Sequence, residues 1–228
     1  MKLTHQVPIA RTLLIAVLVG GLFPGGALPQ QSKPDQPLSV AEAQAILSEK
    51  GTELTDADLA RICTAQELTE LDLSGCNQIT SKGVSCIAEL QELTSLSISR
   101  CPRVTIDGIR AISDLPMLAR LDISQTRIPL PAVYSELTKL PSLTRLEVRG
   151  IRGFKSDGLQ SLPNLKHLDI SNSTGGIKDA DLAPLATLTS LTYLNLNGSR
   201  QWSANRSLTD KGLKHIEGLT SLEFLGLF

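Results

Sequence analysis

Apolar residues recur along most of the chain in a pattern about 25 residues long. The stretch from Leu68 to Leu90 reads LTELDLSGCNQITSKGVSCIAEL, and residues 93–115 read LTSLSISRCPRVTIDGIRAISDL. The leucine that opens the pattern is followed by its next copy after 25, 25, 25, 22, 26 and 31 residues, at Leu68, Leu93, Leu118, Leu143, Leu165, Leu191 and Leu222. Repetition of this kind predicts a solenoid of stacked units.

Each unit has a strand-like half followed by a helix-like half. Apolar and polar residues alternate through Leu71, Asp72 and Leu73, which is the period of a half-buried strand, whereas Ile87 and Leu90 have helical spacing. One unit buries too little aliphatic surface to offset its loss of conformational entropy, so the units must stack. We therefore predict an α/β fold, a curved right-handed solenoid with parallel strands on the concave face and helices on the convex face.

Two stretches depart from the pattern. Pro129 and Pro131 remove backbone donors where the other units begin their helices, so we expect a delayed helix start there. The last step contains about six extra residues in the sequence GSRQWSANRS, which includes the only tryptophan, Trp202. An insertion in a solenoid projects as a loop, in which Trp202 serves either as a lid on the repeats or as a binding anchor.

The amino-terminal region has the composition of a targeting segment. Basic residues precede an apolar run over 13–23 and small residues at 25–27, which predicts a signal peptide over residues 1–27 and export to the periplasm or the extracellular space. An uncleaved anchor is the alternative. The polar, proline-containing residues 28–38 are predicted to form a disordered linker.

The folded region is predicted to begin with a cap. Ser39 and Glu42 have the spacing of a capping box, so residues 39–66 are expected to form an N-terminal helical cap and half a repeat. Residues 67–228 are then the repeats, the last of them incomplete because the chain stops directly after its seventh strand. An uncovered strand edge predicts either self-association with a second copy or a sequence that is part of a longer protein.

The pattern L-x-x-L-x-L-x-x-C, with ITSKG or LTDKG opening the helix, resembles the cysteine-containing class of leucine-rich repeats. The resemblance covers Leu54 to the end of the chain. SGCNQITSKG in particular is similar to the repeats of F-box substrate adaptors, and the whole arrangement is similar to bacterial exported leucine-rich-repeat proteins. The family implies a ladder of side chains that bond to loop carbonyls, at positions occupied here by Cys76, Cys101, Thr126, Ile151, Ser173 and Ser199. Ile151 cannot form such a bond.

The four cysteines allow two interpretations. Cys76 and Cys101 occupy the ladder, and a buried cysteine often acts as a small apolar residue, so we predict reduced thiols in the core. Export would permit disulfides, and the alternative is a bridge between Cys63 and Cys86 that ties the cap to the first repeat.

Charge and motifs argue against several functions. The 22 basic and 23 acidic residues nearly cancel, which does not favour nucleic acid or a membrane surface as a partner. The sequence has no CxxC or HExxH motif, so no metal or other cofactor is expected. His167, Asp169 and Ser171 are two apart on one strand, about 6.6 Å between successive members, which is too far for a catalytic triad.

The strand alternation places one set of side chains on the concave face. The candidate partner-binding residues are Asp72, Arg120, Asp122, Arg145, Glu147, Arg149, His167, Asp169, Tyr193, Asn195 and Trp202. Crowded carboxylates on neighbouring strands favour a protein or peptide ligand with a basic patch. The predicted function is a non-catalytic protein-interaction scaffold that is exported, and the alternative is an F-box-like substrate adaptor in ubiquitin-dependent proteolysis.

Overall fold

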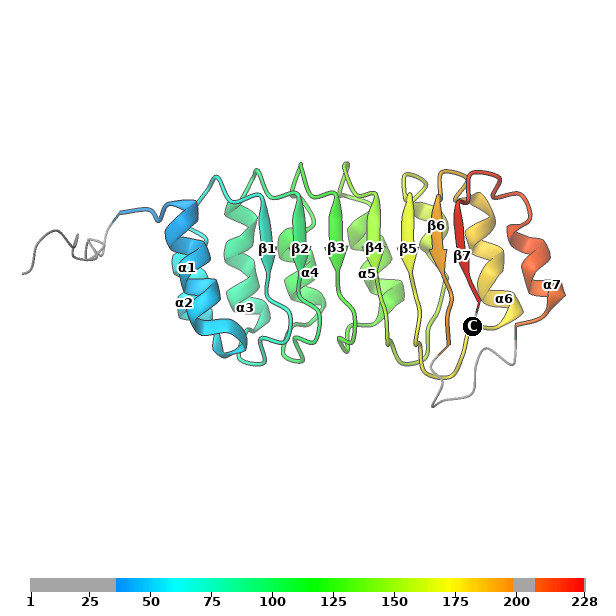
Figure 1. The fold of residues 1–228 in the computed structure, drawn as a ribbon, viewed down its shortest axis with the longest axis horizontal. Coiled ribbons are helices and arrows are strands. Elements are labelled where there is room, and N and C mark those ends of the chain that lie inside the picture. Colours follow the sequence, from blue (N-terminus) through cyan, green and yellow to red (C-terminus); the bar gives the residue numbers. More distant parts are fainter. Residues whose placement is uncertain (1–35, 199–207, 228) are drawn as a thin grey trace, which may run out of the picture. The chain divides into compact units, whose positions relative to one another are not determined.

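The computed structural model describes residues 36–198 and 208–227. The predicted signal peptide, most of the linker, Ser199 and Trp202 lie outside these residues. Seven strands form one parallel sheet in chain order (Figure 1). The strands are β1 (Glu70–Asp72), β2 (Ser95–Ser97), β3 (Arg120–Asp122), β4 (Arg145–Glu147), β5 (His167–Asp169), β6 (Tyr193–Asn195) and β7 (Phe224–Gly226).

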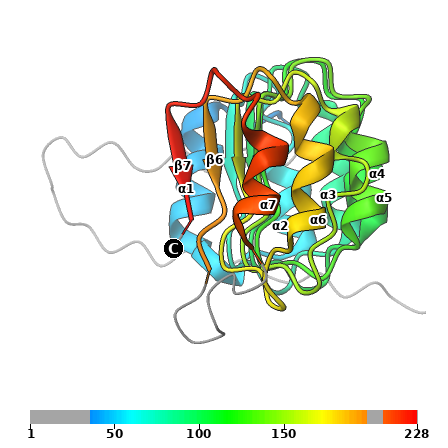
Figure 2. The same cartoon turned by 90° about the vertical axis from the view of Figure 1, so that its right-hand side faces the viewer.

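Short helices precede the first strand and connect each strand to the next. The α-helices are α1 (Val40–Lys50), α2 (Asp56–Ile62), α3 (Ser81–Val84), α4 (Ile106–Ile112), α5 (Leu130–Leu137), α6 (Asp179–Leu182) and α7 (Asp210–Leu213). The 3-10 helices are η1 (Gly51–Glu53), η2 (Ser85–Glu89), η3 (Leu159–Ser161), η4 (Ala183–Thr187) and η5 (Lys214–Ile216). Figure 2 shows the strands in one layer and the helices from α3 to α7 in another, which confirms the predicted solenoid. No helix among the described residues has the length and apolarity needed to cross a membrane.

The middle residue of each strand is a leucine that points into the core. Strand pairing aligns these leucines in one row, Leu71, Leu96, Leu121, Leu146, Leu168, Leu194 and Leu225. The first six are at most 2% exposed, whereas Leu225 is 39% exposed. Full burial of one leucine contributes about 1.5 to 3 kcal/mol, so this row is a large part of what holds neighbouring repeats together.

Helix α1 has a capping box at its start and a glycine at its end. The Ser39 hydroxyl accepts a hydrogen bond from the Glu42 N–H, and the Glu42 carboxylate accepts one from the Ser39 N–H at 2.9 Å. Gly51 follows the last residue of α1 with a φ of 50°, a conformation that glycine adopts at little cost. The second helix, α2, begins with a capping box of its own, formed by Thr55 and Asp58.

The motif T-x-x-G at the helix starts links one repeat to the next. The Thr80 N–H and hydroxyl donate to the two carboxylate oxygens of Asp56 at 2.8 and 2.6 Å, and Thr209 bonds to Asp179 in the same way. Thr80 also caps its own helix α3. The glycine three residues later lies directly under the Asp56 carboxylate, where a side chain would collide with it. ITSKG and LTDKG are thus inter-repeat connections as well as helix starts.

Replacing Gly83 with alanine is expected to lower the free energy of unfolding by about 2 kcal/mol. The added Cβ would lie 2.6 Å from the Asp56 Cγ, so the carboxylate must move away and its bonds to Thr80 weaken. Gly218→Ala is the matched control, because a Cβ there meets nothing within 4 Å. Chemical denaturation followed by circular dichroism measures both changes, and equal losses would contradict the proposed link.

The ladder positions bond to carbonyl oxygens as the family resemblance implied. The Cys101 thiol donates to the Leu73 carbonyl at 3.1 Å, and the Cys76 thiol donates to the Gly51 carbonyl at 3.5 Å. Burial raises the pKa of the Cys101 thiol to about 12, so the thiol is neutral at physiological pH. The Thr126 and Ser173 hydroxyls donate to carbonyls at 2.7 and 2.8 Å.

The third and fourth repeats depart from the regular repeat pattern. Helix α5 begins 12 residues after Leu118 (130 − 118), whereas α3 begins 13 residues after Leu68 (81 − 68), so the expected delay is wrong. The prolines are tolerated because the first N–H groups of a helix have no intrahelical acceptor. In the fourth repeat the buried Ile151 forms no ladder bond with its side chain, and its carbonyl accepts the Thr174 N–H at 2.9 Å instead.

Two of the cysteines are bridged. Cys63 and Cys86 form a disulfide between the end of α2 and the helical half of the first full repeat, with their Cα atoms 5.9 Å apart. Our expectation of four reduced thiols is therefore wrong for this pair and right for Cys76 and Cys101. Stacking brings equivalent helix faces of neighbouring repeats together, and this places the two side chains within bonding reach.

Candidate binding face

The strand residues on either side of the leucine row form the candidate binding face. Register pairs Glu70, Ser95, Arg120, Arg145, His167, Tyr193 and Phe224 in one column, and Asp72, Ser97, Asp122, Glu147, Asp169, Asn195 and Gly226 in the next. Ten of the eleven candidate residues lie in these columns or directly beside them, and Trp202 lies outside the described residues. A groove of about 450 Å³ over β1 to β4 is lined by six of them, Asp72, Arg120, Asp122, Arg145, Glu147 and Arg149.

The acidic column has a structural role that our sequence interpretation missed. Asp72, Asp122 and Asp169 each accept, through Oδ1, the backbone N–H of the serine two residues later, at 2.8, 2.8 and 2.9 Å. Asn195 does the same for the N–H of Asn197 at 3.1 Å. This is the turn that aspartate and asparagine favour, and it follows four of the strands, β1, β3, β5 and β6. The signal was present in the sequence as D-x-S or N-x-N after four of the seven central leucines.

Arginines neutralise the crowded carboxylates from within the chain. Arg149 lies 3.1 Å from the Asp122 carboxylate and 2.9 Å from that of Glu147, and Arg145 lies 2.7 Å from Glu147. Burial disfavours the Arg149 cation, but the charges of Glu147 and Asp122 outweigh burial and raise its pKa above the ordinary value. The repulsion expected between Asp122 and Glu147 is thus relieved by Arg149.

Aromatic rings follow the charged groove along the same face. His167 stacks on Tyr193 with ring centroids 3.9 Å apart, and Tyr193 stacks on Phe224 at 4.4 Å, with the planes within 9° of parallel. Parallel strands hold the rings at a spacing that matches stacking. Burial, with the nearby Arg145 charge, lowers the pKa of His167, so its ring is neutral at pH 7. The sequence located these aromatic residues but did not predict the stack.

Asp169 differs from the other candidates because it is buried. Asp169 is only 6% exposed, and its Oδ2 accepts a hydrogen bond from the Asn195 side-chain amide at 3.1 Å. A partner therefore has little access to this carboxylate, and a charge reversal there would disturb the fold before it reported on binding. Among residues 36–198 and 208–227, no cluster of histidine, cysteine and acidic side chains is arranged to hold a metal ion.

The repeats, the parallel sheet and the open polar face define a leucine-rich-repeat protein. Residues 60–228 match the family model described as Zer-1-like leucine-rich repeats, and the chain belongs to this family. A search of curated proteins found no match.

Solved structures of leucine-rich-repeat proteins share the fold. Internalin InlC2 of Listeria monocytogenes has a TM-score of 0.53 at 20% identity, with 85% of this chain and 98% of that chain covered. Internalin InlF of the same organism has a TM-score of 0.50 at 20% identity. The match covers 74% of this chain and 50% of the solved InlF chain. TLR13, solved in complex with ssRNA13, has a TM-score of 0.51 at 20% identity over 76% of this chain and 27% of that chain.

Proposed function

We propose that this protein is an exported, non-catalytic scaffold that binds a protein or peptide through the face formed by β1 to β7. The observation that carries the proposal is the unbroken register of the seven strands, which presents the groove and the aromatic stack as one polar, aromatic surface. Extended surfaces of stacked repeats are binding surfaces in solenoid proteins generally. Surfaces with exposed tyrosine and arginine suit protein partners.

The charge distribution supports a partner that contributes a basic side chain at one end of the face. Glu70 and Asp72 on β1 are exposed, and neither has an ion-pair partner within the described part of the chain. Asp122 and Glu147 are already paired with arginines. The basic group of the partner is therefore expected over β1, and an apolar or aromatic group is expected over the stack at the other end.

The Cys63–Cys86 disulfide supports export. Disulfides persist in oxidising compartments and are rare in the cytosol, where an F-box-like adaptor would work. Fractionation of cells followed by intact mass measurement tests this part of the proposal. Protein in the exported fraction, with its amino terminus near Ala27 and the bridge intact, is expected. Reduced protein confined to the cytosol would favour the adaptor alternative.

Binding is tested by charge reversal on β1. A partner captured from the exported fraction is expected to lose at least about tenfold in affinity for the variant Glu70→Lys, since a favourable charge contact becomes repulsive while the turn held by Asp72 stays intact. A control with the same type of substitution is Glu89→Lys, at an exposed position of η2 on the helix side. Calorimetric titration measures each Kd. Equal affinity of the β1 variant and the control would overturn the expected orientation of the partner.

A further inference from the structure

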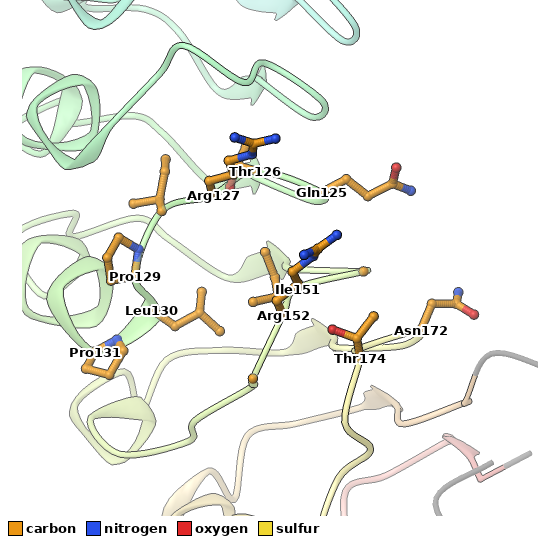
Figure 3. Close-up of a pocket in the computed structure, with 13 residues that line it drawn as sticks. Gln125, Thr126, Arg127, Pro129, Leu130, Pro131, Ile151, Arg152, Asn172 and Thr174 are labelled. Atoms are coloured by element: carbon orange, nitrogen blue, oxygen red, sulfur yellow. The ribbon is translucent and has the colours of Figure 1, made fainter. Parts of the chain in front are cut away.

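A second cavity opens at the edge of the sheet, where the loops follow β3, β4 and β5. It has a volume of about 1100 Å³, slightly above that of ordinary ligand sites, and 13 residues line it (Figure 3). The loops come from the third, fourth and fifth repeats, and the cavity is separate from the groove on the strand face. None of the residues predicted from the sequence to bind a partner lines this cavity.

The cavity results from the irregularity of these repeats. In the third repeat Pro129 and Pro131 open α5 immediately after the loop, and both prolines lie in the cavity wall. In the fourth repeat Gly150 and Gly153 have φ values of 67° and 61°, so the loop between them turns sharply at both ends. The loop of the fourth repeat pairs with that of the fifth through a parallel bridge between Arg152 and Thr174, which fixes the backbone of Arg152.

Two arginines give the cavity a positive charge. Arg127 and Arg152 extend from neighbouring loops, and no acidic residue is present among the lining residues (Figure 3). Both arginines are exposed, and neither has an ion-pair partner among the described residues. This differs from the strand face, where Arg145 and Arg149 are paired with carboxylates. The cavity therefore presents two cations whose charge the described chain leaves uncompensated.

We propose that this cavity binds an acidic peptide segment of a partner protein, with a glutamate or aspartate carboxylate held by Arg127 and Arg152. A guanidinium matches the planar carboxylate with two parallel hydrogen bonds, which favours arginine for this task. The wall formed by Pro129, Leu130 and Pro131 is apolar and suits the methylene groups of an acidic side chain. The site is distinct from the strand face, so it stands or fails independently of the proposed function.

The test uses the full chain labelled with ¹⁵N, with the arginine Nε–Hε signals of Arg127 and Arg152 assigned from Arg127→Lys and Arg152→Lys variants. A blocked tetraglutamate peptide is the probe, and a blocked tetraglutamine peptide and inorganic phosphate are the comparisons. Tetraglutamate is expected to shift the signals of both arginines while leaving that of Arg103 in place. Arg103 is an exposed arginine in the equivalent loop region of the second repeat, outside the cavity.

The affinities of variants complete the test. Arg127→Ser and Arg152→Ser are each expected to weaken tetraglutamate binding by about tenfold, because each removes a charge-assisted hydrogen bond. Arg103→Ser is expected to change it by less than about twofold. Absence of a shift at either arginine, equal shifts from tetraglutamine, equal weakening by Arg103→Ser, or tighter binding of phosphate than of tetraglutamate would each overturn the proposal.

Discussion

Replacing Leu146 with alanine is expected to lower the free energy of unfolding by about 4 kcal/mol. Leu146 is fully buried in the middle of the leucine row, between Leu121 and Leu168 on the neighbouring strands. Truncation removes apolar surface from both inter-repeat contacts and leaves a cavity that the packed strands cannot close. Chemical denaturation followed by circular dichroism measures the loss.

Leu225→Ala is the matched control for this prediction. Leu225 occupies the same strand position in β7 but is 39% exposed, so its truncation is expected to cost less than about 1 kcal/mol. Both leucines are the middle residues of their strands, but β4 pairs with a strand on each side and β7 pairs only with β6, so the difference between the two variants reports the burial that stacking on both sides provides. Similar losses at Leu146 and Leu225 would mean that the leucine row does not carry the contacts between repeats.

The second large effect is expected from removing the disulfide. Replacing Cys63 and Cys86 together with alanine should lower the free energy of unfolding by about 3 kcal/mol, because the bridge closes a loop in the unfolded chain. The two cysteines are 23 residues apart in the sequence. Thermal unfolding with and without dithiothreitol measures this effect. The reductant should lower the midpoint of the unaltered protein and leave that of the double variant unchanged; a midpoint lowered equally in both would contradict the assignment.

The sequence was sufficient to predict the repeating architecture because periodicity reports directly on stacking. Alternation around each leucine identified the strands, and the pairing of Glu70 with Ser95, and of Ser95 with Arg120, follows from the 25-residue step. The columns on the strand face were therefore predictable residue by residue. Once strands pair in register, a polar residue beside a buried leucine has one face to occupy.

Contacts between side chains were less predictable than positions. The sequence placed Asp122, Glu147 and Arg149 on one face, but it did not predict that Arg149 pairs with both carboxylates. The disulfide was a choice between two plausible states of Cys63 and Cys86. The cavity at the loop edge escaped prediction because it arises where the period fails, and irregular loops have no repeat from which to infer their shape.

The helix start in the third repeat illustrates a wrong inference with a clear physical reason. Pro129 and Pro131 were interpreted as obstacles because they lack N–H donors. The structure places them before and within the first turn of α5, where donors are not required and a fixed φ assists the helix. The same residues then form the wall of the loop-edge cavity. A departure from the repeat pattern thus shaped a site instead of weakening the fold.

Site-specific photo-crosslinking tests the central claim, that the strand face is the surface that binds the partner, most directly. A photoreactive phenylalanine analogue is placed at Ser95 or Arg120 on the strand face, or at Ser135 or Lys139 on the helix side, in protein recovered from the exported fraction. The proposal predicts that one partner is crosslinked from Ser95 and Arg120 and not from the helix-side positions. Crosslinks to that partner from Ser135 and Lys139 alone would contradict it.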